Sequence, residues 1–125
     1  MRCLVVIGVA VLTALISTRV QAQELTGSWD GTVTQYGPGT HRGTYEAKMA
    51  LDGKTGTIDY PSLGCGGKLV FIELRGSAYA YRERLSYGID RCVNYGLVTV
   101  VRTEGGLQWE WTMDIVGKAV LKPSR

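Results

Sequence analysis

One short segment of the sequence sets a carboxylate among tyrosines. Tyr79, Tyr81 and Glu83 occupy alternate positions, so an extended strand would place their side chains on one face. A carboxylate on an otherwise apolar, buried face needs a partner or shifts its pKa. Arg75 or Arg102, on neighbouring predicted strands, is the expected partner. The segment therefore predicts either a polar group that orients a ligand in a pocket or a structural ion pair.

A second group of residues surrounds two cysteines. Cys65 lies in a predicted loop over 61–67, and Cys92 lies in another over 88–95. A bridge between them would bring both loops to one rim. Tyr and Arg dominate interface hot spots, so such a rim suits protein recognition, with a purely structural staple as the alternative. The candidate rim residues are Tyr60, Ser62, Tyr87, Asp90, Arg91 and Tyr95.

A third group consists of the tryptophans Trp29, Trp109 and Trp111. In a small barrel, large side chains facing inward either pack the interior solid or line a ligand cavity. The sequence leaves both interpretations open. Together with the alternating segment, they give the candidate interior residues Trp29, Tyr79, Tyr81, Glu83, Trp109 and Trp111.

The residue types argue against an enzyme. His41 is the only histidine, so a catalytic triad would need it to meet a serine and an acid from distant loops. Ser62 does not lie in a Gly-x-Ser-x-Gly turn. Nothing places two carboxylates together for glycoside hydrolysis, and a metal site would need more Cys or His. We expect no catalytic residue, no metal and no cofactor.

Residues 1–22 have the three parts of a secretory signal. Arg2 gives a positive start, Leu4–Ile16 is an apolar run, and a small-residue cleavage site ends at Ala22. An uncleaved membrane anchor is the alternative, but spanning a bilayer takes about 20 apolar residues. We expect a single exported domain over 23–125 that is periplasmic or secreted and has no transmembrane segment.

Removal of the signal changes the charge of the chain. Loss of Arg2 and Arg19 would lower the formal net charge from +3 to +1. The remaining acids and bases are interspersed and form no basic patch of the kind that binds nucleic acid. We therefore expect the partner to be a protein, a glycan or a small molecule, and not a nucleic acid.

The two remaining cysteines, Cys65 and Cys92, predict one disulfide. An even number of cysteines in an oxidising compartment favours a bridge. It would close a loop of about 27 residues, which stabilises by roughly 3 kcal/mol in the chain-entropy description. The alternatives are a metal site, which needs more ligands, and a redox pair, which is more often Cys-x-x-Cys.

Short alternating runs of β-branched and aromatic residues between Gly-rich breaks predict an all-β fold. Hairpin-length connections, such as Asp52-Gly53, favour a small antiparallel meander. Closing it into a barrel would remove exposed strand edges, and a two-sheet sandwich is the alternative. The eight expected strands are 25–36, 44–51, 55–60, 68–75, 77–87, 97–103, 107–115 and 117–121.

Two stretches of the sequence resemble known groups. Leu25-Thr26-Gly27-Ser28-Trp29 resembles the first strand of calycin-type barrels, the lipocalin and avidin group, where a Gly-x-Trp closes one end. The pattern Y-P-S-L-G-C-G-G, then R-E-R-L-S-Y-G, then Cys92, is similar to a domain of uncharacterised exported bacterial proteins. This second resemblance implies a β domain with the cysteines as its framework pair, and it implies no activity.

These observations favour an exported, non-catalytic binding module whose ligand is a protein, a glycan or a small apolar molecule. The alternatives are a structural or envelope-associated module without a small ligand, and an inhibitor of a secreted hydrolase. An open cavity with an uncompensated polar group would favour the binding module. Solid packing around Trp29, Trp109 and Trp111 would favour the structural one.

Overall fold

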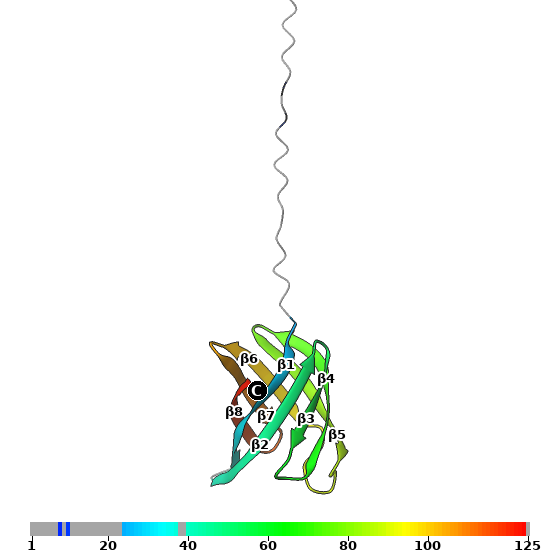
Figure 1. Cartoon of the computed structure of the whole chain (residues 1–125), viewed down its shortest axis with the longest axis vertical. Coiled ribbons are helices and arrows are strands. Elements are labelled where there is room, and N and C mark those ends of the chain that lie inside the picture. The colour runs from blue at the N-terminus through cyan, green and yellow to red at the C-terminus, as the bar shows by residue number, and fades with distance from the viewer. Residues whose placement is uncertain (1–7, 9, 11–23, 38–39, 125) are drawn as a thin grey trace, which may run out of the picture.

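The described part of the chain forms eight antiparallel strands in sequence order (Figure 1). The computed structural model describes residues 8, 10, 24–37 and 40–124, and at 40–42 it describes the backbone. Apart from Gly8 and Ala10, the predicted signal at 1–22 lies outside the described residues. The strands are β1 (Thr26–Gly37), β2 (Thr40–Asp52), β3 (Thr55–Tyr60), β4 (Cys65–Arg75), β5 (Ala78–Tyr87), β6 (Leu97–Thr103), β7 (Gly106–Thr112) and β8 (Val116–Pro123).

Each strand pairs with the next, and β8 returns to pair with β1, which closes the barrel. The predicted all-β meander, its closure and its single disulfide are therefore confirmed, and the sandwich alternative is wrong. Closure gives every strand a neighbouring strand on each side, which removes the two outer edges that an open sheet would expose.

Alternation along the strands separates the inside of the barrel from the outside. In β2, Ala47, Met49 and Leu51 are buried, and the residues between them are exposed. Trp109 and Trp111 alternate in the same way on β7. At the predicted Asp52-Gly53 hairpin turn, Gly53 has φ +66°, a conformation that glycine adopts without strain.

The structure differs from the predicted strand boundaries by three residues or more at three places. β2 already begins at Thr40, so most of the expected loop over 37–43 belongs to a long hairpin. β4 begins at Cys65, so that cysteine starts a strand and does not lie in a loop. β7 ends at Thr112, so the expected strand over 107–115 stops earlier, and Met113 is 52% exposed in the bend before β8. In each case the pairing with the neighbouring strand decides where the strand begins or ends, and the pattern of residues alone does not show that boundary.

The two ends of the barrel are built differently. At the end where β1 begins (upper end in Figure 1), Leu25 is fully buried and its carbonyl accepts a hydrogen bond of 3.1 Å from the backbone N–H of Gly53. The hydroxyl of Tyr81 also reaches this turn, donating to the Gly53 carbonyl at 3.4 Å. This end is sealed by apolar packing. The other end carries the two cysteine-bearing segments.

Large side chains fill the interior between the sealed end and the middle of the barrel. Trp109 and Tyr81 are the two largest fully buried side chains, and Phe71 packs edge-on to Tyr81 with ring centroids 5.6 Å apart. Among the described residues, the indole nitrogen of Trp109 is the one buried side-chain polar atom without a hydrogen-bond partner. Trp109 is 1% exposed and belongs to the hydrophobic core cluster.

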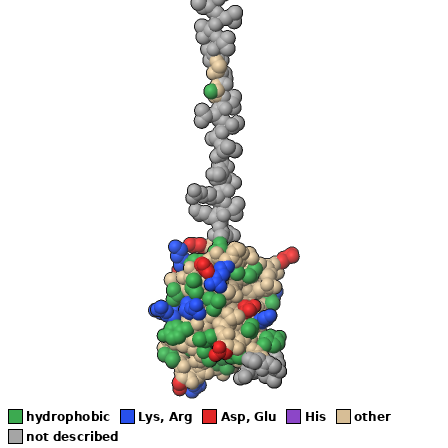
Figure 2. All heavy atoms as spheres, turned by 180° about the vertical axis from the view of Figure 1, so that it is seen from behind, with side chains coloured by type: hydrophobic (Ala, Val, Ile, Leu, Met, Phe, Trp, Pro, Cys, Tyr) green, Lys and Arg blue, Asp and Glu red, His purple; other side chains and the backbone are tan. Residues whose placement is uncertain are grey.

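Hydrophobic side chains also reach the surface. On β4, Val70, Ile72 and Leu74 are each about two-fifths exposed. On the face shown in Figure 2, hydrophobic side chains lie between charged ones. The described part of the chain contains no helix that is long and apolar enough to cross a membrane.

The disulfide joins Cys65 to Cys92 across 27 positions and makes a testable contribution to stability. We expect Cys65→Ser to lower the free energy of unfolding by about 2–5 kcal/mol, the usual cost of losing a native disulfide from a small domain. Urea unfolding measures this value. Cys92→Ser is the matched control, because it removes the same bridge and should give the same loss. An unchanged unfolding curve for both variants would contradict the prediction.

Candidate functional site at the barrel mouth

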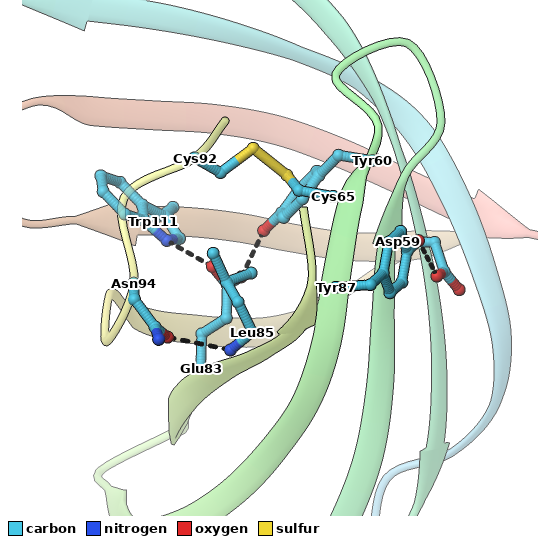
Figure 3. The surroundings of a disulfide bond; sticks show 9 residues. All are labelled: Asp59, Tyr60, Cys65, Glu83, Leu85, Tyr87, Cys92, Asn94 and Trp111. Carbon is cyan, nitrogen blue, oxygen red and sulfur yellow. Dashed lines mark hydrogen bonds between the residues drawn. A yellow bond between two sulfur atoms is a disulfide. The ribbon is translucent and has the colours of Figure 1, made fainter. Parts of the chain in front are cut away.

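A cavity of about 210 Å³ opens at the disulfide-bearing end of the barrel. Its walls come from the ends of several strands and from the segment between β5 and β6, which folds over the opening (Figure 3). The position at a barrel mouth is one where proteins commonly bind small molecules. The lining residues are Gln35, Tyr45, Tyr60, Leu63, Glu83, Arg91, Cys92, Val93, Trp111 and Ile115.

Glu83 lies at the inner end of this cavity and is only 1% exposed. The Tyr60 hydroxyl donates a hydrogen bond of 2.5 Å to its Oε2. The indole N–H of Trp111 donates to its Oε1 at 3.3 Å. Figure 3 shows both donors pointing at the carboxylate from opposite sides. Each carboxylate oxygen thus has one protein donor, and both donors are neutral.

The expected arginine partners of Glu83 lie elsewhere. Arg75 pairs with Glu73 on its own strand, and Arg102 donates to the backbone carbonyl of Glu24 at 3.1 Å. In the part of the chain whose side chains are described, the Arg75 pair is the only salt bridge. The prediction of an ion pair at Glu83 by either arginine is wrong, because both side chains lie on the exposed surface.

Burial raises the pKa of Glu83 above its ordinary value, and the hydrogen bonds from Tyr60 and Trp111 oppose that rise. Tyr45 lies close enough for the charge of Glu83 to act on it. Burial, and then that charge, raise the pKa of Tyr45 to about 12. Its ring packs edge-on to Tyr60, with centroids 5.6 Å apart and planes at 82°. The carboxylate is therefore surrounded by aromatic groups that stay neutral near pH 7.

The segment over 88–96 is held to β5 by hydrogen bonds from backbone N–H groups of that strand. β5 continues past the start of β6, which leaves part of its edge without a strand partner. The side-chain oxygen of Asn94 accepts 2.9 Å hydrogen bonds from the backbone N–H groups of Leu85 and Tyr95. The N–H of Glu83 donates to the carbonyl of Gly96 at 2.9 Å. This segment thus takes the place of a strand over the mouth.

Two glycines allow the close contacts around the site. A Cβ at Gly96 would lie 2.0 Å from the indole nitrogen of Trp111, so a side chain there would displace the donor to Glu83. A Cβ at Gly88 would lie 2.1 Å from the carbonyl oxygen of Gly64, and Gly88 has φ +62°. The two cysteine-bearing segments therefore touch through backbone as well as through the disulfide.

The structure separates the predicted rim residues. Tyr60 is 4% exposed and lies beneath the rim, inside the barrel, while Arg91 lines the cavity. Tyr87 is 45% exposed and its hydroxyl donates to Asp59, away from the cavity (Figure 3). Ser62, Asp90 and Tyr95 are exposed around the opening segments. Tyr95 also has φ +66°, unusual for a residue other than glycine.

The predicted interior residues also separate. Glu83 and Trp111 line the cavity, whereas Tyr81 and Trp109 belong to the filled core. Trp29 is partly buried, and its indole donates to the carbonyl of Thr26 at 3.2 Å. Tyr79 is partly buried against the core.

Sequence reasoning missed five residues of the site: Gln35, Tyr45, Leu63, Val93 and Ile115. The alternation of Tyr45 with Ala47 and Met49 on β2 already indicated that it faces inward. It did not indicate which end of the barrel carries the opening. That depends on how the strands are staggered around the closed sheet.

A second hollow, of about 490 Å³, lies across β1, β6, β7 and β8. Its polar lining residues include Thr32, Glu110 and Lys118, and these are exposed or half-exposed. A charged group in contact with water carries little cost that a ligand would relieve. The mouth cavity is therefore the stronger candidate site.

The comparisons with known proteins add no identification. No protein-family model, curated protein or solved structure matches the chain. Within the described residues, no cluster of three or more His, Cys, Asp or Glu side chains is placed to hold a metal ion. The site is therefore interpreted from its own geometry.

The raised pKa of Glu83 predicts a pH-dependent stability. The folded protein holds this proton more tightly than the unfolded chain, whose Glu83 titrates near 4.5. The stabilising contribution is full below that pH and is lost as pH rises through the raised pKa. Relative to wild type, Glu83→Gln should therefore gain stability between pH 4 and pH 8. Urea unfolding at both pH values tests this, and a pH-independent difference would contradict it.

The hydrogen bond from Tyr60 predicts a second difference. Tyr60→Phe removes a donor from a buried carboxylate, which should cost about 1.5–3 kcal/mol at pH 8. Tyr87→Phe is the matched control, because its hydroxyl bonds the carboxylate of Asp59 on the exposed surface. We expect a smaller loss for the control. If both variants lost the same free energy of unfolding in urea, the prediction that the buried Tyr60–Glu83 hydrogen bond contributes more than the exposed one would be wrong.

Proposed function

We propose that this domain is a non-catalytic binding module and that the mouth cavity is its ligand site. The observation that carries the proposal is the position of Glu83, a 1% exposed carboxylate at the inner end of a cavity open to solvent. Ligand sites typically combine apolar walls with a few placed polar groups that fix orientation. The walls contributed by Tyr45, Leu63 and Ile115 match that description.

The energetics of Glu83 support a binding role over a purely structural one. Burying a carboxylate without a cation costs free energy, and an apolar side chain of similar size would pack this position without that cost. A few neutral donors reduce the cost and leave the carboxylate able to accept further hydrogen bonds. A function for the group explains why this position holds glutamate.

The volume of the cavity limits the size of the ligand. The cavity volume of about 210 Å³ is below the roughly 300 Å³ at which drug-sized ligand sites begin. The ligand is therefore small, or inserts one end and leaves the rest outside. A large apolar molecule carried in the interior is not supported, because Trp109 and Tyr81 fill that space.

A protein partner is a second candidate, favoured by the exposed side chains of the segment over the mouth. Ile89, Val93 and Tyr95 are each more than half exposed. Inhibition of a secreted hydrolase would place these residues against the target. The disulfide is consistent with an oxidising compartment, so we retain the periplasmic or secreted location within the proposal.

A fragment screen tests the small-molecule proposal. We expect some small aromatic or aliphatic fragments to shift the indole N–H resonance of Trp111 in a ¹⁵N-labelled sample. Val93→Phe should weaken those shifts by narrowing the opening. Val70→Phe, on the outer face of β4, is the matched control and should leave them unchanged. A Trp111 resonance unmoved by every fragment would contradict a ligand site here.

A further inference from the structure

We propose that the mouth cavity takes a small organic ammonium ion, with its charged nitrogen at Glu83 and its apolar part against the aromatic walls. This inference rests on the proposed function of the same cavity. It adds the charge and the chemical class of the ligand.

The charge balance of the cavity floor points to a cation. Glu83 receives hydrogen bonds from the Tyr60 hydroxyl and the Trp111 indole, which carry no charge. An ionised carboxylate has about four lone-pair sites, so acceptor capacity remains after these two bonds. An ammonium group would supply both the missing charge and the missing donors.

The one cationic residue among those that line the cavity does not fill this role. Arg91 is exposed, and its side chain lies against Gly64, where a Cβ would stand 2.8 Å from its Nη1. It belongs to the segment over the mouth, whereas Glu83 lies at the inner end. An arginine at the opening leaves the inner carboxylate without a paired cation.

The aromatic side chains around Glu83 favour the same ligand class. Tyr45 and Tyr60 pack edge-to-face, and Trp111 approaches the carboxylate from another strand. The faces of aromatic rings attract cations, and this attraction is largest at desolvated sites. A carboxylate among aromatic rings is therefore complementary to an ammonium group that carries apolar carbon. An anionic ligand would meet the charge of Glu83 directly.

The titratable groups that face Glu83 make the expected pH dependence simple. Tyr45 on β2 and Tyr60 on β3 have pKa values raised to about 12 or well above the ordinary 10, so they stay neutral below pH 9. Arg91 is the other charged residue among those that line the cavity. Glu83, whose pKa burial raises above the ordinary 4.5, is the carboxyl group among the residues that line the cavity. Binding of an ammonium ion should therefore strengthen as pH rises and Glu83 loses its proton.

The test uses three probes of one shape and different charge: phenethylamine, 2-phenylethanol and 3-phenylpropionate. Their binding is followed by the Trp111 indole resonance and by calorimetry. We expect the amine to bind at least tenfold more tightly than the alcohol and the carboxylate to give no shift. Affinity for the amine should rise from pH 5 to pH 8, with no matching rise for the alcohol.

Two variants locate the effect. Glu83→Gln should weaken binding of the amine at least tenfold and reduce its pH dependence. Glu110→Gln removes a carboxylate from the same strand as Trp111, in the other hollow, and should change neither. The probe series and the pH dependence need only wild-type protein, so they test the ammonium inference even if Glu83→Gln does not fold.

The outcomes separate the two proposals. If the alcohol or the carboxylate binds as well as the amine at the Trp111 site, the ammonium inference is overturned and the binding function stands. If no probe moves the Trp111 resonance while a fragment of another shape does, the inference again fails alone. If nothing moves that resonance, both proposals fail.

Discussion

The contact of Glu83 with Tyr60 and Trp111 is the constraint around which the mouth of the barrel is arranged. It joins β5 to β3 and β7, which do not neighbour β5 in the sheet, so it spans the interior. The carboxylate is almost fully buried and has no charged partner among the described side chains. A group of this kind is stable only where its donors are held in place. The surrounding backbone supplies that rigidity.

Three features hold the donors and the carboxylate together. Gly96 leaves room for the indole of Trp111, which a Cβ would contact at 2.0 Å. Asn94 occupies the open edge of β5 next to Glu83 and so fixes the segment above it. The disulfide ties that segment to the start of β4. At the opposite end of the barrel, Leu25 and Tyr81 belong to the buried core. The buried carboxylate of Glu83 therefore lies at one end of an otherwise apolar interior.

Local patterns were sufficient to predict the barrel, because strand alternation and turn residues are encoded within a few positions. The same alternation placed Glu83 and Trp111 inside. It did not predict that Tyr60 is the partner of Glu83, or that Tyr60 lies beneath the rim, since this contact crosses the barrel. Such contacts depend on the stagger of all eight strands, which no single segment determines. The early end of β7 has a related cause, because its pairing with β8 stops at Thr112.

The account depends most directly on the ionisation of Glu83. A ¹³C NMR titration of its side-chain carboxyl carbon would measure the pKa in the folded protein. We predict a pKa clearly above the ordinary 4.5, because burial outweighs the two neutral donors. We also predict a fall in that pKa when phenethylamine is present, as expected for a bound cation. A value at or below 4.5 in the free protein would mean that the carboxylate is already stabilised, and would contradict the account.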